Sequence, residues 1–314
     1  MSQVLSLGSV NVDSVHTITR AERESLEDRY EWFPDRGETV EVDSVPSGFG
    51  DDPDEVRHGG KGANQAVATA HAAAAATLLG RVGPDHDEFG VLSALEGDDV
   101  DTSRIGIASV PTGTAFVFVG PAGDNSIVLR PGANSTVDES YIDEQYETIL
   151  AADCLLLQNE IPVEPVAALL ADLADEPDRP TVFLDPAPAA GAERLLGHGV
   201  VDYLTPNETE YETLRPYLDA FDGTLVRKRG EGDVIVEGEQ AFTVTPPAVE
   251  VADTTGAGDV LNGFLAARIA DGASVRAAVE TAVVAGSLST RAVGARGAVP
   301  TLSAVRSFQA STDT

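Results

Sequence analysis

A run of small residues between two aspartates is the part of this chain best suited to chemistry. The stretch Asp253-Thr254-Thr255-Gly256-Ala257-Gly258-Asp259 leads directly into an apolar segment that is expected to be helical. Small residues let the backbone close on a ligand, and the amides that open a helix bind anions. Asp259, in the first turn, can accept the proton of an attacking hydroxyl. The motif predicts an anion hole formed by Gly256, Ala257 and Gly258 beside a general base, as in phosphoryl transfer. The alternative is a glycine-rich helix start that aspartate merely caps.

A second glycine motif, Gly59-Gly60-Lys61-Gly62-Ala63-Asn64, precedes an alanine-rich segment that we expect to form a helix. The glycines allow a close approach, Lys61 supplies a cation, and Asn64 offers both a donor and an acceptor. No Ser or Thr follows the lysine, so the spacing is not that of a Walker phosphate loop. Recognition of a polyol is the better interpretation.

Asn11 and Asp13 follow the first predicted strand, which ends near Gly8. One residue separates them, so both side chains can lie on one side of the strand end and bind neighbouring hydroxyls. Turn formation, which is common for Asn and Asp, is the alternative.

The chain is strongly acidic, with 52 Asp and Glu against 20 Lys and Arg and a formal net charge of -32. Such a surface repels nucleic acid and anionic membranes, which are therefore excluded as partners. Because the acids are spread along the whole chain, adaptation to high salt is the favoured explanation. A phosphate site must carry its own positive potential, and both lysines, Lys61 and Lys228, stand beside glycines.

The remaining composition indicates a globular protein of the cytoplasm. Cys154 is the only cysteine, so no disulfide can form within the chain, and it is expected to be a buried structural thiol. The N-terminal segment lacks the basic region of a secretion signal, and the alanine-rich stretch 66–80 is too short to span a bilayer.

Strands and helices alternate after residue 150, which predicts an α/β fold with a doubly wound, mostly parallel sheet flanked by helices. A hairpin between Pro111 and Arg130 does not fit that alternation, and the polar region 19–58 is expected to be irregular with short edge strands. We assign these segments to a small β-sheet lid. The predicted core comprises residues 1–12, 59–108 and 131–314, and the predicted lid comprises residues 13–58 and 109–130.

The motifs, in this order, resemble the ribokinase family of carbohydrate kinases within the phosphofructokinase-B superfamily. The resemblance covers nearly the whole chain. It rests on Asn11-x-Asp13, the two glycine motifs, Gly80-Arg81-Val82-Gly83, Asp185-Pro186-Ala187-Pro188 and Thr205-Pro206-Asn207-Glu208-Thr209-Glu210. The segment from Asp13 to Gly59 is longer than is typical of the family.

The resemblance implies a set of roles for named residues. The implied sugar contacts are Asn11, Asp13, Gly60, Lys61, Asn64 and Glu160. The implied nucleotide contacts, for ATP, are Asn207, Lys228, Gly230 and Gly258. Glu210 would act indirectly on Mg²⁺, while Asp253 and the backbone of Thr255 would bind a monovalent cation such as K⁺. Family members pair through their lids, so a homodimer is expected.

These implications predict ATP-dependent phosphorylation of the 5-hydroxyl of D-ribose, with Asp259 as the base. Within the same family, the alternatives are kinases for fructose, 2-keto-3-deoxygluconate, nucleosides or ribose 1-phosphate, the last kept open by Arg57 and the enlarged lid. A sugar- or nucleotide-binding sensor without catalysis is an alternative of another class. A nicotinamide-dependent oxidoreductase is disfavoured, because the dinucleotide fingerprint is absent.

Overall fold

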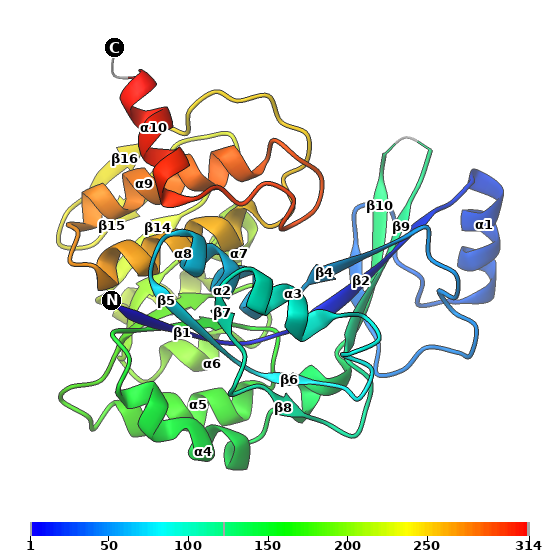
Figure 1. Cartoon of the computed structure of the whole chain (residues 1–314), viewed down its shortest axis with the longest axis horizontal. Helices are drawn as coiled ribbons and strands as arrows, with labels where there is room; N and C mark the ends of the chain where they lie inside the picture. Colours follow the sequence, from blue (N-terminus) through cyan, green and yellow to red (C-terminus); the bar gives the residue numbers. More distant parts are fainter. Residues whose placement is uncertain (1, 122, 313–314) are drawn as a thin grey trace.

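The computed structural model describes residues 2–121 and 123–312, and within them the larger sheet has nine strands (Figure 1). Their order is β16-β15-β14-β13-β12-β11-β1-β5-β7. Neighbours are parallel from β14 to β7, and β14, β15 and β16 form an antiparallel edge. The strands are β1 (Gln3–Leu7), β5 (Ala75–Leu79), β7 (Val100–Asp101), β11 (Cys154–Gln158), β12 (Thr181–Asp185), β13 (Val201–Leu204), β14 (Thr224–Arg227), β15 (Val234–Glu237) and β16 (Phe242–Val244).

Helices cover both faces of this sheet, as predicted (Figure 1). One layer contains α2, α8, α9 and α10, and the other contains α4, α5 and α6. The helices are α2 (Lys61–His71), α3 (Val91–Gly97), α4 (Glu139–Leu150), α5 (Val163–Leu173), α6 (Glu193–Leu196), α7 (Glu208–Leu214), α8 (Ala257–Ala270), α9 (Val275–Ser289) and α10 (Leu302–Thr312). Short elements complete the core: β6 (Arg81–Val82), β8 (Gly106–Ile107), η1 (Gly132–Thr136) and η2 (Arg215–Ala220).

The interior strand β11 shows that the sheet is buried on both faces. All five of its residues are buried, and a parallel strand that is covered on both faces is expected to be a continuous apolar run. Leu155 and Leu157 pack into the hydrophobic core on one side, whereas Cys154 and Leu156 pack into the core on the other. Cys154 is buried and free, as predicted.

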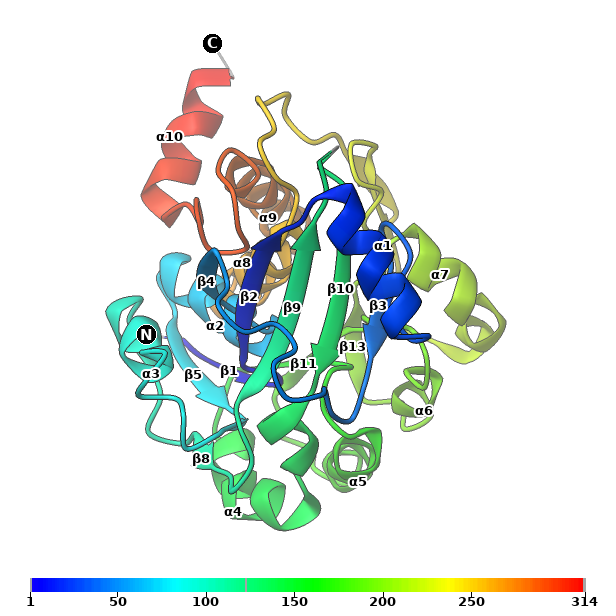
Figure 2. The same ribbon diagram turned by 90° about the vertical axis from the view of Figure 1, so that its right-hand side faces the viewer.

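A second sheet stands beside the core and forms the lid (Figure 2). Its order is β3-β10-β9-β2-β4, with β9 and β10 forming the predicted antiparallel hairpin. Its strands are β2 (Asn11–Thr17), β3 (Thr39–Glu41), β4 (Glu55–Gly59), β9 (Gly113–Val119) and β10 (Asn125–Arg130). The fold class predicted from the sequence is therefore confirmed, while the exact division into core and lid residues remains a prediction.

The polar region after β2 is less irregular than predicted, because it contains the helix α1 (Arg20–Arg29). Thr19 caps this helix and Glu22 completes a capping box, a signal that is readable in the sequence. The helix lies on the outer side of the lid sheet (Figures 1 and 2). Aromatic side chains between the helix, the following loop and the sheet form a separate small core that includes Phe33, Phe49 and Phe118.

No helix among the described residues has both the length and the apolar character needed to cross a membrane.

Candidate active site

Polar residues that follow neighbouring parallel strands of the large sheet meet at the carboxyl ends of those strands. Ligands of open α/β sheets bind outside the carboxyl ends of the strands. Here, Ser9 follows β1, Glu160 follows β11, Asp185 ends β12, Asn207 follows β13 and Lys228 follows β14. The helix α8 begins at the same edge, and the lid strands β2 and β4 lead out of it (Figure 1).

Asp259 lies in the first turn of α8 and is 4% exposed. Two amides from α2 hold its carboxylate: Asn64 Nδ2 donates to Oδ2 at 3.0 Å, and Gln65 Nε2 donates to Oδ1 at 3.1 Å. Amide donors on both oxygens fix the orientation of the carboxylate. Asp259 therefore faces the glycine motif that starts α2, so the structure brings the two predicted motifs together.

Gly256 opens α8 in a left-handed conformation, with φ of 76°. A Cβ on Gly256 would lie 2.8 Å from Cα, Cβ and the carbonyl oxygen of Ala295, so only glycine fits this position. The backbone amides of Gly258 and Asp259 have no acceptor among the residues that the structure describes. Free amides at a helix N-terminus suit an anion. They differ from the predicted set of Gly256, Ala257 and Gly258, because the Ala257 amide donates to the carbonyl of Thr254 at 3.2 Å.

Lys228 adds a positive charge beside these amides. A Cβ on Gly258 would lie 3.3 Å from Lys228 Nζ, so the ammonium packs against the start of α8. The Lys228 amide donates to the carbonyl of Pro206 and forms an isolated bridge with Asn207, which ties the loop after β14 to the loop after β13. The predicted nucleotide residues Asn207, Lys228 and Gly258 are therefore adjacent. Gly230, with φ of 59°, lies in the exposed loop beyond them.

The predicted sugar contacts converge where the lid joins the core. Gly60 has φ of 88°, and a Cβ there would lie 2.8 Å from the amide nitrogen of Asn11. Asn11 pairs with Gly59 across strands β2 and β4, and Asn134 Nδ2 donates to Asn11 Oδ1 at 2.8 Å. The carboxylate of Asp13 lies against Gly59, because a Cβ on that glycine would lie 2.4 Å from both oxygens.

Burial changes the ionisation of the acidic groups at this end of the site. Desolvation raises the pKa of Asp13 to about 6, although Arg296 opposes this shift. Desolvation also raises the pKa of Glu160, whose carboxylate accepts bonds from the Ser9 hydroxyl and the Lys61 amide. The pKa of Lys61 is raised, chiefly by the Asp259 carboxylate, so its ammonium stays charged among carboxylates.

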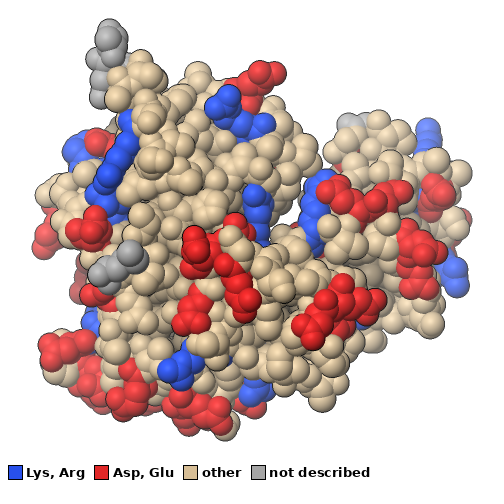
Figure 3. Space-filling view, in the orientation of Figure 1, with Lys and Arg blue, Asp and Glu red and all other residues tan. Residues whose placement is uncertain are grey.

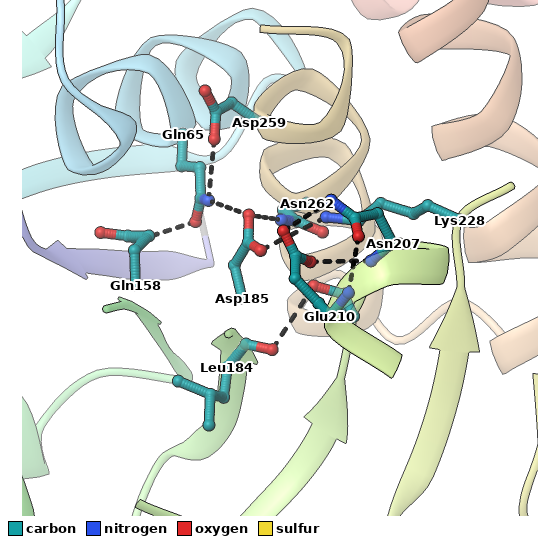
Figure 4. A network of polar contacts seen from close by, with 10 residues as sticks. Gln65, Gln158, Leu184, Asp185, Asn207, Glu210, Lys228, Asp259 and Asn262 are labelled. Carbon is teal, nitrogen blue, oxygen red and sulfur yellow. Dashed lines mark hydrogen bonds and ion pairs between the residues drawn. The ribbon is translucent and has the colours of Figure 1, made fainter. Parts of the chain in front are cut away.

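Asp185 is the centre of a polar network (Figure 4). The sequence motifs gave Asp185 no role in the site. Its carboxylate is 3% exposed and accepts bonds from Gln65 Nε2 at 3.2 Å and Asn262 Nδ2 at 2.8 Å. It also pairs with Lys228 Nζ at 3.4 Å. Gln65 therefore links Asp185 to Asp259, and Gln158 holds Gln65 in turn through a 2.7 Å bond.

Asn207 and Glu210 form a capping box at the start of α7. Glu210 accepts bonds from the amide and the side chain of Asn207, at 2.7 and 2.6 Å, and burial raises its pKa. No group of three or more His, Cys, Asp or Glu suited to a metal ion occurs in the described part of the chain. Mg²⁺ commonly binds through one or two carboxylates, water and substrate phosphates, so Glu210 near Lys228 fits an indirect role of this kind.

Asp253 ties the start of the anion motif to the segment after α9. Its Oδ1 accepts bonds from the amide and hydroxyl of Thr255, at 2.9 and 2.7 Å, and its Oδ2 accepts a bond from the Gly294 amide at 2.8 Å. Burial opposes ionisation, but these hydrogen bonds lower the pKa of Asp253 overall. Asp253 and Thr255 are thus neighbours, as a shared cation site requires.

Sequence reasoning missed Ser9, Gln65, Asp185, Asn262 and Arg296 as members of the site. Asp185 stood in a motif that supported the resemblance, and Gln65 directly follows the second glycine motif, so local signals existed for these two. Asn262 stands one turn after Asp259 on the same helix, a spacing that places both on one face. Nothing in the sequence around Arg296 indicated its position.

A doubly wound core, a β lid, and a carboxylate beside a helix start with free amides define a small-molecule kinase. The model of the pfkB family carbohydrate kinases matches residues 53–302. A ribokinase of Lactococcus lactis is 34% identical over 314 residues, covering 98% of this chain and 96% of the relative. A ribokinase of Bacillus subtilis is 36% identical over 254 residues, covering 77% and 84%. The solved structure of Arabidopsis thaliana ribokinase complexed with ribose and ATP superimposes with a TM-score of 0.77, 26% identity and 98% coverage of both chains.

The chain belongs to the pfkB family of carbohydrate kinases, which confirms the resemblance found in the sequence. It is therefore a phosphotransferase with a carbohydrate hydroxyl as acceptor.

Proposed function

We propose that this protein transfers the γ-phosphoryl group of ATP to the 5-hydroxyl of D-ribose. One observation carries the proposal: the carboxylate of Asp259, held by Asn64 and Gln65, lies in the first turn of a helix whose amides at Gly258 and Asp259 are free. A base and an anion hole within one helical turn suit the charge that develops in phosphoryl transfer. The ribokinases of Lactococcus lactis and Bacillus subtilis support ribose as the acceptor.

The transfer step is an in-line displacement. The 5-oxygen of ribose forms a bond to the γ-phosphorus, the bond from that phosphorus to the β-bridging oxygen breaks, and ADP leaves. Asp259 takes the hydroxyl proton. The amides of Gly258 and Asp259, with the ammonium of Lys228 beside them, stabilise the charge on the transferred group.

The other predicted residues have supporting roles in this proposal. Asn11, Asp13, Gly60, Lys61, Asn64 and Glu160 bind the sugar hydroxyls, and Asn207 and Gly230 bind the nucleotide. Glu210 would hold Mg²⁺ indirectly, and the ion would supply neutralisation of phosphate charge. K⁺ at Asp253 and Thr255 remains a prediction, as do the homodimer through the lid, the cytoplasmic location and the adaptation to high salt.

A substrate panel tests the proposal. The full chain is assayed for ADP release in molar KCl with Mg²⁺-ATP and D-ribose, D-fructose, 2-keto-3-deoxygluconate or adenosine as acceptor. We expect a higher kcat/KM for D-ribose than for the other three acceptors. A higher value for another sugar would reassign the acceptor within the family. Ligand-dependent melting shifts without ADP release from any acceptor would instead favour a non-catalytic sensor.

A further inference from the structure

The side chain of Gln65 is fully buried and lies between two buried carboxylates of the site (Figure 4). Its Nε2 donates to Asp259 Oδ1 at 3.1 Å and to Asp185 Oδ2 at 3.2 Å. The nitrogen of a primary amide carries two protons, so each carboxylate receives one of them. Gln65 therefore shares its donors between the proposed base on α8 and the carboxylate that ends β12.

A second buried glutamine fixes the orientation of this amide. Gln158, at the end of β11, donates from Nε2 to Gln65 Oε1 at 2.7 Å. If the Gln65 amide were turned over, its oxygen would face two carboxylates and its nitrogen would face the donor of Gln158. The partners on both sides therefore assign the nitrogen of Gln65 to the carboxylates.

Asp185 and Asp259 are like charges in a part of the molecule that water barely reaches. They are 3% and 4% exposed, and because one nitrogen donates to both, their oxygens are no more than two hydrogen-bond lengths apart. Like charges at such a distance repel, and the repulsion favours protonation of one of the pair. A shared amide donor opposes this protonation, because its hydrogen bonds stabilise the ionised form of each carboxylate.

Other charged groups face the same pair from neighbouring elements. Lys228 Nζ lies 3.4 Å from Asp185 Oδ1. The others, each of which interacts electrostatically with Asp185 or Asp259, are Lys61, Glu160, Glu210 and Arg296. A substitution of Gln65 leaves all of these groups in the chain, so a comparison of variants isolates the effect of the shared amide.

We propose that Gln65 is a positioning residue, which keeps Asp259 ionised and correctly oriented by anchoring it to Asp185. A carboxylate takes a proton from a hydroxyl only while it is ionised, and its orientation decides how well it reaches that proton. Because Asp185 also pairs with Lys228, the anchor connects the base to the nucleotide side of the site. The inference rests on the proposed function, because it takes Asp259 as the base.

Gln65→Met tests this role, because methionine is also unbranched and fills a similar space but has no donor. The kcat of the full chain is measured at pH 6 and pH 8 with Mg²⁺-ATP and a saturating concentration of D-ribose, or of the best acceptor in the substrate panel. We expect kcat to fall by about tenfold or more at pH 8, with little change in the KM for ATP. The factor should be larger at pH 6, because carboxylates without the shared donor hold a proton more readily.

Gln145→Met is the matched control. Gln145 is a buried glutamine of α4, a helix on the other face of the sheet from α2 and α8, and its substitution should change neither kcat nor its dependence on pH. Asp185→Asn provides a second background, because it removes one of the two charges. In that background, Gln65→Met should lower kcat by the same factor at pH 6 and pH 8.

Two kinetic results would overturn the inference: Gln65→Met keeps native kcat, or it lowers kcat by the same factor at both pH values in the otherwise native chain. The second result would mean that Gln65 only fills space. Should Gln65→Met not fold, Gln158→Met removes the bond that orients the Gln65 amide and leaves the amide itself in place. A smaller loss with the same dependence on pH is expected there, and a loss that does not depend on pH would count against the inference.

Thermal unfolding separates this inference from the proposed function, because it needs no turnover. Without the shared donor, the folded variant holds a proton that the unfolded chain has lost, so its stability falls as pH rises. The loss of Tm in Gln65→Met, relative to the native chain, should be greater at pH 7.5 than at pH 5 by about 2 °C or more. In the Asp185→Asn background the losses at the two pH values should be equal.

Equal losses of Tm at pH 5 and pH 7.5 in the otherwise native chain would contradict the shared-donor role of Gln65, whatever the enzyme phosphorylates. A native chain that releases no ADP with any acceptor would instead refute the proposed function. The melting comparison would still decide whether Gln65 keeps the two carboxylates ionised.

Discussion

At the scale of single residues, Asp13 and Asp259 are two carboxylates with different surroundings. Amides from Asn64 and Gln65 hold both oxygens of Asp259, which suits a fixed proton acceptor. Asp13 lies against Gly59, and burial raises its pKa to about 6. An ionised carboxylate accepts bonds from sugar hydroxyls more strongly than a protonated one, so the affinity for the acceptor should fall below pH 6.

Asp13→Asn should stabilise the protein at neutral pH while it weakens the binding of the acceptor. The native pKa of Asp13 lies above its ordinary value of 3.8, so the native state binds more protons than the unfolded chain between pH 4 and 6. Stability therefore falls as pH rises through this window and stays lower above it. We expect Asp13→Asn to raise Tm at pH 7.5 by roughly 2–4 °C.

The same comparison at pH 4 should show almost no difference in Tm, because the native carboxyl is then protonated. In the native chain, KM for the acceptor should rise as pH falls below 6, whereas Asp13→Asn should have a high KM at every pH. A variant that melts lower than the native chain at pH 7.5 would contradict the raised pKa.

At the scale of elements, the start of α8 fits closely against the segment after α9. Gly256, in its left-handed conformation, contacts Ala295, and Asp253 accepts a bond from the Gly294 amide. The anion site is therefore positioned by a segment about forty residues further along the chain.

Gly256→Ala tests this contact, because the added Cβ would lie 2.8 Å from the Ala295 backbone and would displace the free amides. We expect kcat to fall by about 10² or more. Gly272→Ala is the matched control: Gly272 has φ of 79° beyond the other end of α8, and no atom lies within 4 Å of an added Cβ. It should cost about 1–2 kcal/mol of stability and leave kcat unchanged.

The prediction for α8 fails if Gly256→Ala keeps native kcat, or if both variants lose activity equally. The first outcome would mean that the segment after α9 shifts to accommodate the added Cβ and that the amides at the start of α8 keep their positions. The second would mean that strain in the left-handed conformation, rather than contact with Ala295, governs the activity.

The predictable parts of the site are those encoded by neighbouring residues. Asp259 and Gly256 belong to one local motif, and Lys61 and Asn64 to another, so residue types and spacing were enough to find them. Arg296 joins the site only because its segment packs between α2 and the lid, and single-sequence patterns do not encode such packing.

For the fold as well, local sequence patterns determined which elements could be predicted. Continuous apolar runs such as Leu155-Leu156-Leu157 predicted the buried parallel strands, and alternation with helices predicted the doubly wound topology. The helix Arg20–Arg29 was missed because its residues are mostly polar and its apolar periodicity is weak. Its capping box, Thr19 with Glu22, was the signal that mattered.

At the scale of the whole molecule, the charge of -32 opposes compactness through self-repulsion. Acidic side chains form several clusters on the face shown in Figure 3. Screening lengths shorten from about 10 Å at 0.1 M salt to about 3 Å at 1 M, so added salt should relieve the repulsion.

We therefore expect Tm to rise steadily with KCl from 0.1 to 2 M. Tetramethylammonium chloride at equal ionic strength is the control, because general screening predicts a rise with both salts. A rise with KCl alone would point to a specific potassium site such as Asp253 and Thr255, and a Tm independent of both salts would contradict adaptation to high salt.

The proposed phosphoryl transfer depends above all on Asp259 as the base beside the anion site. Single-turnover transfer from ATP to D-ribose, or to the best acceptor of the substrate panel, is measured by rapid quench for the native chain and Asp259→Asn at saturating acceptor. We expect the rate constant to fall by roughly 10² or more while the Kd values for ATP and acceptor change little. A native rate constant in a folded Asp259→Asn variant would contradict it.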